Sequence, residues 1–73
     1  MKMILARALR LKGGLSQKSL AQKLNENPSA ISKFENQRGV LSTETLRSMA
    51  KLFGVDDSVD LSREVALRID MDP

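Results

Sequence analysis

Polar side chains gather on a short predicted helix near the middle of the chain, "NPSAISKFENQR", residues 27–38. Asn27 is a favourable N-cap, and Pro28 fits the first helical position because its missing N–H would have no partner there. Ile31 and Phe34 take the side that faces a core, so the polar groups lie around the other side. These polar groups belong to Asn27, Ser29, Ser32 and Lys33. We expect them to form hydrogen bonds with a ligand.

Hydrogen bonding to the edges of DNA bases is a chemistry that these side chains suit. Lysine can donate to O6 and N7 of guanine, and serine can pair with several bases. Ser29 and Lys33 are four residues apart, so they are neighbours on the helix surface. We therefore predict Ser29 and Lys33 as the main base-reading residues, with Asn27 and Ser32 next. The long side chain of Lys33 can also reach a phosphate, which is its alternative role.

A second group of polar residues suits contacts with the phosphate backbone. Gln17 stands at the exposed start of another predicted helix, where backbone N–H groups and a side-chain amide can both hold a phosphate. The alternative is that Gln17 is an ordinary solvated surface residue. The other predicted phosphate contacts are Lys18, Asn36 and Arg38.

Catalysis is not expected from this composition. The chain has no histidine, the commonest general base and metal ligand, and no cysteine for a disulfide or a thiolate zinc site. No glycine-rich phosphate loop and no paired-carboxylate spacing accompany the serines. We therefore expect no enzymatic activity, no metal and no cofactor.

Helical periodicity places the polar residues on a set of short helices. The predicted helices cover residues 3–12, residues 17–24, a segment that opens at Pro28, and residues 43–53. Favourable N-caps precede three of them at Ser16, Asn27 and Ser42. Glycines stop the first helix at Gly13-Gly14 and the fourth at Gly54. The predicted core positions are Leu5, Ala8, Leu9, Leu20, Ala21, Leu24, Ile31, Phe34, Leu46, Met49, Ala50 and Phe53.

The tail shows a different pattern, because apolar and polar residues alternate over residues 65–72. A period of two predicts a half-buried strand, while the spacing of Leu61, Val65 and Ile69 allows a helix as the alternative. A lone strand needs a partner, either a second strand within residues 58–61 or a strand from another chain. A symmetric dimer with paired tail strands would meet this need through Val65, Leu67, Ile69 and Met71.

Charge divides the chain into two halves. Residues 1–38 hold eight lysines and arginines against two acidic residues, a net charge of +6, whereas residues 39–73 hold four against seven, a net charge of −3. This division fits a protein with one face toward a polyanion, and plain solvation of the surface is the alternative.

Length and hydropathy bound the organisation of the chain. With 73 residues we expect one folded domain over residues 1–55 and a dimerisation tail over residues 56–73. No apolar run approaches the roughly 20 residues of a membrane helix, and no signal-peptide pattern appears. We therefore expect a cytoplasmic protein that does not bind a membrane.

Two predicted helices joined by the three residues 25–27 match the geometry of a helix-turn-helix. The second helix of such a pair can lie in the major groove of DNA. A closer likeness is carried by Leu15-Ser16-Gln17, Leu20-Ala21, Leu24, Ile31-Ser32 and Glu35-Asn36. At these spacings the chain resembles the Cro/repressor-type (XRE-like) helix-turn-helix family, from about Leu5 to Val55.

This resemblance implies an all-α, lambda-repressor-like domain of four to five helices that binds double-stranded DNA. It implies a sequence-specific transcriptional regulator of the repressor type, bound as a homodimer to two operator half-sites with the third helix in the major groove. One alternative with the same fold is an antitoxin that sequesters a toxin protein. Another is an interaction module without DNA binding, which the basic first half disfavours.

The resemblance also implies an ion pair between Arg10 and Glu35, in which Arg10 holds the third helix in place instead of contacting DNA. Three positions depart from the family pattern. Asn25 stands where glycine is usual, and asparagine tolerates the left-handed conformation nearly as well. Gln37 stands at a second usual glycine, which leaves the course of the next loop open. Pro28 replaces a residue that often contacts DNA, so we expect fewer base-reading side chains.

Overall fold

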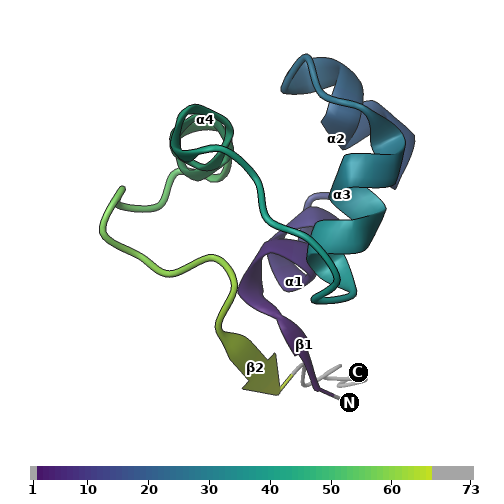
Figure 1. Cartoon of the computed structure of the whole chain (residues 1–73). Coiled ribbons are helices and arrows are strands. Elements are labelled where there is room, and N and C mark those ends of the chain that lie inside the picture. The colour runs from purple at the N-terminus through teal and green to yellow at the C-terminus, as the bar shows by residue number, and fades with distance from the viewer. Residues whose placement is uncertain (1, 67–73) are drawn as a thin grey trace.

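The computed structural model of the chain describes residues 2–66. Along the chain, the elements are β1 (Lys2–Ile4), α1 (Leu5–Lys12), α2 (Gln17–Lys23), α3 (Pro28–Glu35), α4 (Thr43–Phe53) and β2 (Glu64–Ala66), as Figure 1 shows. The described part of the chain thus holds four helices and one short two-stranded sheet, which confirms the predicted all-α domain of four to five helices with a short strand near its C-terminal end. None of the helices among these residues combines the length and the apolar composition that a membrane span requires.

Three helices begin at the predicted N-caps. The hydroxyl of Ser16 accepts a hydrogen bond from the N–H of Ser19 at 3.0 Å, and the hydroxyl of Ser42 accepts from the N–H of Thr45 at 3.2 Å. The side-chain oxygen of Asn27 accepts from the N–H of Ser29 at 2.8 Å. Each bond satisfies one of the amide groups that the first turn of a helix leaves without an intrahelical partner.

Each of the four described helices is followed, one or two positions after its last residue, by a residue in the left-handed conformation, and these residues are Gly14, Asn25, Gln37 and Gly54. After α3, for example, the N–H of Gln37 donates to the carbonyl of Phe34 at 3.1 Å and the N–H of Arg38 to that of Lys33 at 2.8 Å. This pair of bonds is the Schellman motif. Gln37, with φ at +59°, therefore takes the left-handed conformation that glycine usually takes at this position. The loop from α3 to α4 thus begins after a common type of helix end.

The start of the first helix differs from the prediction. Residues 3–12 were expected to be helical, but α1 begins at Leu5, and residues 2–4 form β1. Among the described residues, α1 has no side-chain cap; instead, the N–H groups of Leu5 and Ala6 donate to the carbonyls of Arg63 and Leu61, at 2.8 and 2.9 Å. Because carbonyls from the far end of the chain cap α1, nothing near its start in the sequence marked the boundary.

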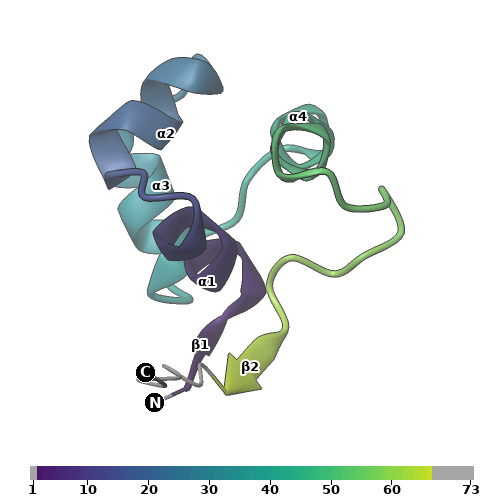
Figure 2. The ribbon, with the colours of Figure 1, turned by 180° about the vertical axis from the view of Figure 1, so that it is seen from behind.

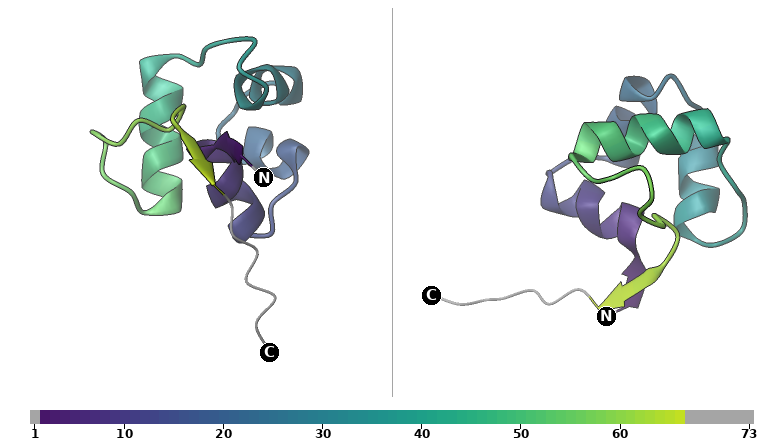
Figure 3. Two further views of the ribbon diagram at one scale, coloured as in Figure 1. Left: turned by 90° about the horizontal axis from the view of Figure 1, so that it is seen from below. Right: turned by 90° about the vertical axis from the view of Figure 1, so that its left-hand side faces the viewer.

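The strand partner of the tail also differs from the prediction. A second strand was expected within residues 58–61 or in another chain, but β2 pairs antiparallel with β1, as the two views of Figure 3 show. Met3 lies opposite Val65 in this ladder, and Met3 is buried while Val65 is half-buried. The described tail residues, Glu64–Ala66, form a strand and not the alternative helix. Leu67, Ile69 and Met71 lie outside the described residues.

The core lies between the helices, with α2 and α3 against each other on one side and α4 on the other (Figure 2). Leu20, Ile31 and Met49 are fully buried there, as the periodicity predicted. Ala21 is fully buried as well. Its small side chain allows the close approach of α2 and α3. The core thus fixes α3 by one side only, through Ile31 and Phe34.

Candidate nucleic-acid interface

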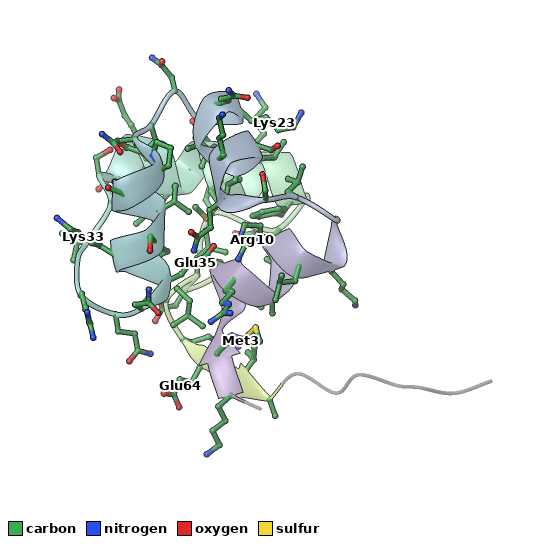
Figure 4. The ribbon with its side chains drawn as sticks, turned by 90° about the vertical axis from the view of Figure 1, so that its right-hand side faces the viewer. Met3, Arg10, Lys23, Lys33, Glu35 and Glu64 are labelled. Atoms are coloured by element: carbon green, nitrogen blue, oxygen red, sulfur yellow. The ribbon has the colours of Figure 1, made fainter. Side chains whose placement is uncertain are left out.

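The outer face of α3 carries the predicted base-reading residues. Ser29 and Lys33 are exposed, Ser32 is partly exposed, and Asn27 is exposed just before the helix begins. Figure 4 shows the Lys33 side chain pointing away from the molecule, while Glu35 on the same helix points toward Arg10. Because the oxygen of Asn27 caps the helix, its NH₂ group is the part that could donate to a base. The structure therefore brings all four side chains to the exposed side of α3.

The predicted phosphate contacts lie on the surface around this face. Lys18, Asn36 and Arg38 are exposed, and Gln17 is partly exposed. The amide of Asn36 donates to the carbonyl of Ser32 at 2.9 Å, and the amide of Gln17 donates to a carboxylate oxygen of Glu35 at 3.1 Å. A side-chain amide has two N–H groups, so Gln17 keeps a second donor for a phosphate, whereas the Asn36 amide also donates to the hydroxyl of Ser32 at 3.5 Å.

Arg10 and Glu35 form a buried ion pair behind the outer face of α3. The Nε and Nη2 atoms of Arg10 donate to Oε2 and Oε1 of Glu35, at 2.7 and 2.9 Å, and the two residues are 7% and 6% exposed. The Nη1 atom of Arg10 donates to the carbonyl of Leu15 at 2.8 Å. The guanidinium thus ties α1, the loop after it and the last residue of α3 together (Figure 4). This is the residue pair that the resemblance implied.

The turn between α2 and α3 contains a contact that sequence reasoning missed. Glu26 is partly buried, and its Oε1 accepts from the N–H of Asn27 at 3.1 Å. Its Oε2 accepts from the hydroxyl of Thr45 in α4 at 3.2 Å. Thr45 lies 19 residues further along the chain, so neither periodicity nor a cap motif signals this contact.

Electrostatics separate the α2–α3 side from the loop after α4. Lysines and arginines lie exposed on the first side, at Lys18, Lys23, Lys33 and Arg38. Acidic residues lie exposed in the loop, at Asp56, Asp57 and Asp60. Hydrogen bonds from Ser58 lower the pKa of Asp56, and the bond from the backbone N–H has a larger effect than the bond from the hydroxyl. Hydrogen bonds from Ser62 lower the pKa of Asp60, and here the bond from the hydroxyl has a larger effect than the bond from the backbone N–H. Both carboxylates therefore favour their charged form.

A groove of about 940 Å³ lies between the connection from α3 to α4 and the loop after α4. Its apolar lining includes Phe34, Leu41, Leu46 and Leu61, and its charged lining includes Arg47, Asp56, Asp57 and Asp60. Val40, which is 93% exposed, also lines it. The groove is therefore a second surface, separate from the outer face of α3.

The fold and the exposed face of α3 define a helix-turn-helix protein, with α2 and α3 as the two helices of the motif. A family model described as helix-turn-helix matches residues 7–59, nearly three quarters of the chain. The chain belongs to this family, the Cro/C1-type (XRE) helix-turn-helix family of DNA-binding transcription regulators. Comparisons with curated proteins and with solved structures found no match.

Proposed function

We propose that this protein recognises a specific operator in double-stranded DNA and acts as a repressor-type regulator. The observation that carries this proposal is the way α3 is held. Ile31, Phe34 and the buried Glu35 fix its inner side, while the side chains of Ser29 and Lys33 are exposed on its outer side. In this arrangement α3 lies in the major groove, and Asn27, Ser29, Ser32 and Lys33 donate to or accept from base edges.

The phosphate backbone supplies much of the affinity in this proposal. Lys18 and Arg38 neutralise phosphates on either side of the major groove, and Gln17 donates through its second amide N–H group. Asn36 donates to a phosphate in place of its long, 3.5 Å bond to the Ser32 hydroxyl. These contacts position α3 but carry no base preference of their own. Such binding takes place where chromosomal DNA lies, in the cytoplasm.

A dimer supplies the part of the specificity that a short recognition face cannot supply. Pro28 begins α3 without a donor, so few groups of the helix reach the bases. Two copies bound to half-sites roughly 34–36 Å apart would add a spacing requirement and a preference for DNA shape. We place the dimer contact in the tail, through Val65, Leu67, Ile69 and Met71, because apolar residues alternate there.

The groove beside α4 favours a second candidate function, an antitoxin that binds a toxin protein. Its lining combines apolar side chains with Asp56, Asp57 and Asp60, which suits an apolar partner segment flanked by basic residues. Co-expression with the product of the neighbouring gene tests this candidate. A stable complex that Val40→Asp abolishes would support it, because Val40 lines the groove and is 93% exposed, and separate elution of the two proteins would contradict it.

Selection from random DNA duplexes at several salt concentrations tests the main proposal. Phosphate contacts predict that log K falls with log[salt], with a slope of about −0.9 for each neutralised phosphate. Base reading predicts a selected sequence bound at least roughly 10³-fold tighter than random duplex. Salt-dependent binding without any preferred sequence would contradict specific regulation, and absence of binding would contradict the whole proposal.

A further inference from the structure

Glu26 connects three helices at the point where α3 begins. Its backbone N–H donates to the carbonyl of Ala21 at 2.8 Å and closes the end of α2. Its carboxylate accepts from the N–H of Asn27, the N-cap of α3, at 3.1 Å and from the hydroxyl of Thr45 in α4 at 3.2 Å. A single side chain therefore links the start of α3 to the first turn of α4.

We propose that Glu26 is a positioning residue that sets base discrimination by fixing the start of α3. This inference rests on the proposed function, because it assumes that α3 reads bases. Asn27 and Ser29 are the two base-reading candidates at the start of the helix, and both are exposed. Glu26 holds the backbone of Asn27, and the side chain of Asn27 in turn holds the N–H of Ser29 at 2.8 Å.

The physical reason is geometric. Base discrimination depends on hydrogen bonds that tolerate only small changes of distance and angle. The buried core residues of α3, Ile31 and Phe34, lie in its middle and last turns, whereas Ala30 in its first turn is only partly buried against the core, so the first turn is less constrained. The bond from Thr45 to Glu26 adds a restraint on the first turn of α3. This restraint comes from α4, which does not contact the bases in the proposed complex. The negative charge of Glu26 also lies near the positive starts of α3 and α4, where a carboxylate is favourable.

The test uses Thr45→Val, which removes the hydroxyl with little change of shape, and Glu26→Ala. We expect each variant to lower the preference for the selected base pairs read by Asn27 or Ser29 by about 3- to 10-fold, less than a lost base contact itself would. The double variant should lose no more than Glu26→Ala alone, because both changes break the same link. The preference at base pairs read by Lys33 should stay within about 2-fold of wild type.

Two controls separate positioning from a general loss of stability. Thr43→Val changes an exposed threonine in the same turn of α4 and should leave base preference unchanged. Ser16→Ala removes the N-cap of α2 and leaves the bond from Thr45 to Glu26 intact, so it should lower the melting temperature without changing base preference. If Thr45→Val and Glu26→Ala lower stability but leave every base preference at the wild-type value, the inference is overturned.

Amide hydrogen exchange gives a second readout that requires no DNA. The N–H of Asn27 should exchange slowly in the wild type and at least about 5-fold faster in Thr45→Val, relative to amides of the core. If the wild type selects no DNA sequence, the proposed function fails, and this exchange measurement alone decides whether Glu26 holds the start of α3. Equal exchange at Asn27 in both proteins would overturn the positioning role.

Discussion

Arg10 and Glu35 are 25 residues apart in the chain, yet their side chains form a buried two-bond ion pair with nitrogen–oxygen distances of 2.7 and 2.9 Å. The pair joins α1 to the last residue of α3, and Gln17 adds a third hydrogen bond to the same carboxylate. Because Glu35 points inward, the residues on the other side of α3 are left for a ligand. The pair is therefore a structural support for the proposed reading face.

Breaking this pair from one side should destabilise the protein strongly. Arg10→Ala leaves the Glu35 carboxylate buried without its cation, and such a loss costs about 3–5 kcal/mol. We predict a fall of this size in the free energy of unfolding, measured by urea denaturation. The control Arg47→Ala removes an exposed arginine on α4 and should change stability by less than about 0.5 kcal/mol.

A paired replacement distinguishes a lost charge from lost packing. Arg10→Met combined with Glu35→Leu removes both charges and should recover most of the stability that Arg10→Ala loses. If Arg10→Ala cost less than about 1 kcal/mol, the pair would not hold α3 in the way described.

Replacing the left-handed residue after α3 should stabilise the fold. Gln37 has a φ of +59°, which a residue with a Cβ adopts at a cost of roughly 1 kcal/mol. Gln37→Gly should therefore raise the free energy of unfolding by about 0.5–1 kcal/mol, seen as a rise of several degrees in the melting temperature. Gln22→Gly is the matched control on exposed, helical α2, and it should destabilise by a similar amount. A fall in stability for Gln37→Gly would contradict this interpretation.

Local signals in the sequence predicted most of the helical frame. Ser16, Asn27 and Ser42 are side-chain caps next to the helices they begin, and α4 has the predicted bounds, Thr43–Phe53. The start of α1 could not be found in this way, because its first N–H groups bond to carbonyls at Leu61 and Arg63. The strand β1 has only three residues, too few to show a period of two.

For the proposed DNA-binding site as well, the sequence predicted the features that depend on local spacing but not those that depend on long-range contacts. The polar face of α3 follows from the spacing of Ile31 and Phe34, which leaves its polar residues on the other side. The bond from Thr45 to Glu26 joins residues far apart in the chain, so only the folded arrangement shows it. For Gln17, local sequence signals predicted its position at the start of α2, but its hydrogen bond to Glu35 is visible only in the folded structure.

Acid should remove a specific part of the stability. Folded-state hydrogen bonds lower the pKa of Asp56 and of Asp60 below the usual value, so each carboxylate stabilises the fold above roughly pH 4. This stabilisation is lost as the pH falls through the lowered folded-state pKa. Asp56→Asn and Asp60→Asn should therefore lose less free energy of unfolding than the wild type between about pH 5 and pH 2.

Urea denaturation at a series of pH values measures this dependence. Ser48→Ala removes no carboxylate and should follow the wild-type curve, which makes it the control. Equal acid dependence in Asp56→Asn, Asp60→Asn and the wild type would show that the two hydrogen-bonded turns do not contribute.

Removal of residues 67–73 should convert the proposed dimer into a monomer. A chain that ends at Ala66 keeps β2 and the carbonyls that cap α1, so its helical circular dichroism should be retained. Light scattering should then report one chain per particle, against two for the full chain. The same mass for both proteins would place any dimer contact elsewhere, whereas loss of helical signal would show that the tail is needed for folding.

The most direct test of the central claim compares the base preferences of Lys33→Ala and Arg38→Ala over a full set of single-base operator variants. If α3 reads bases, Lys33→Ala should lose about 1–3 kcal/mol of discrimination at one base pair and keep its preference at the others. Arg38→Ala should weaken binding to every duplex alike and reduce the salt slope by about 0.9. Uniform weakening by both variants, with the operator preference intact, would contradict base reading by α3.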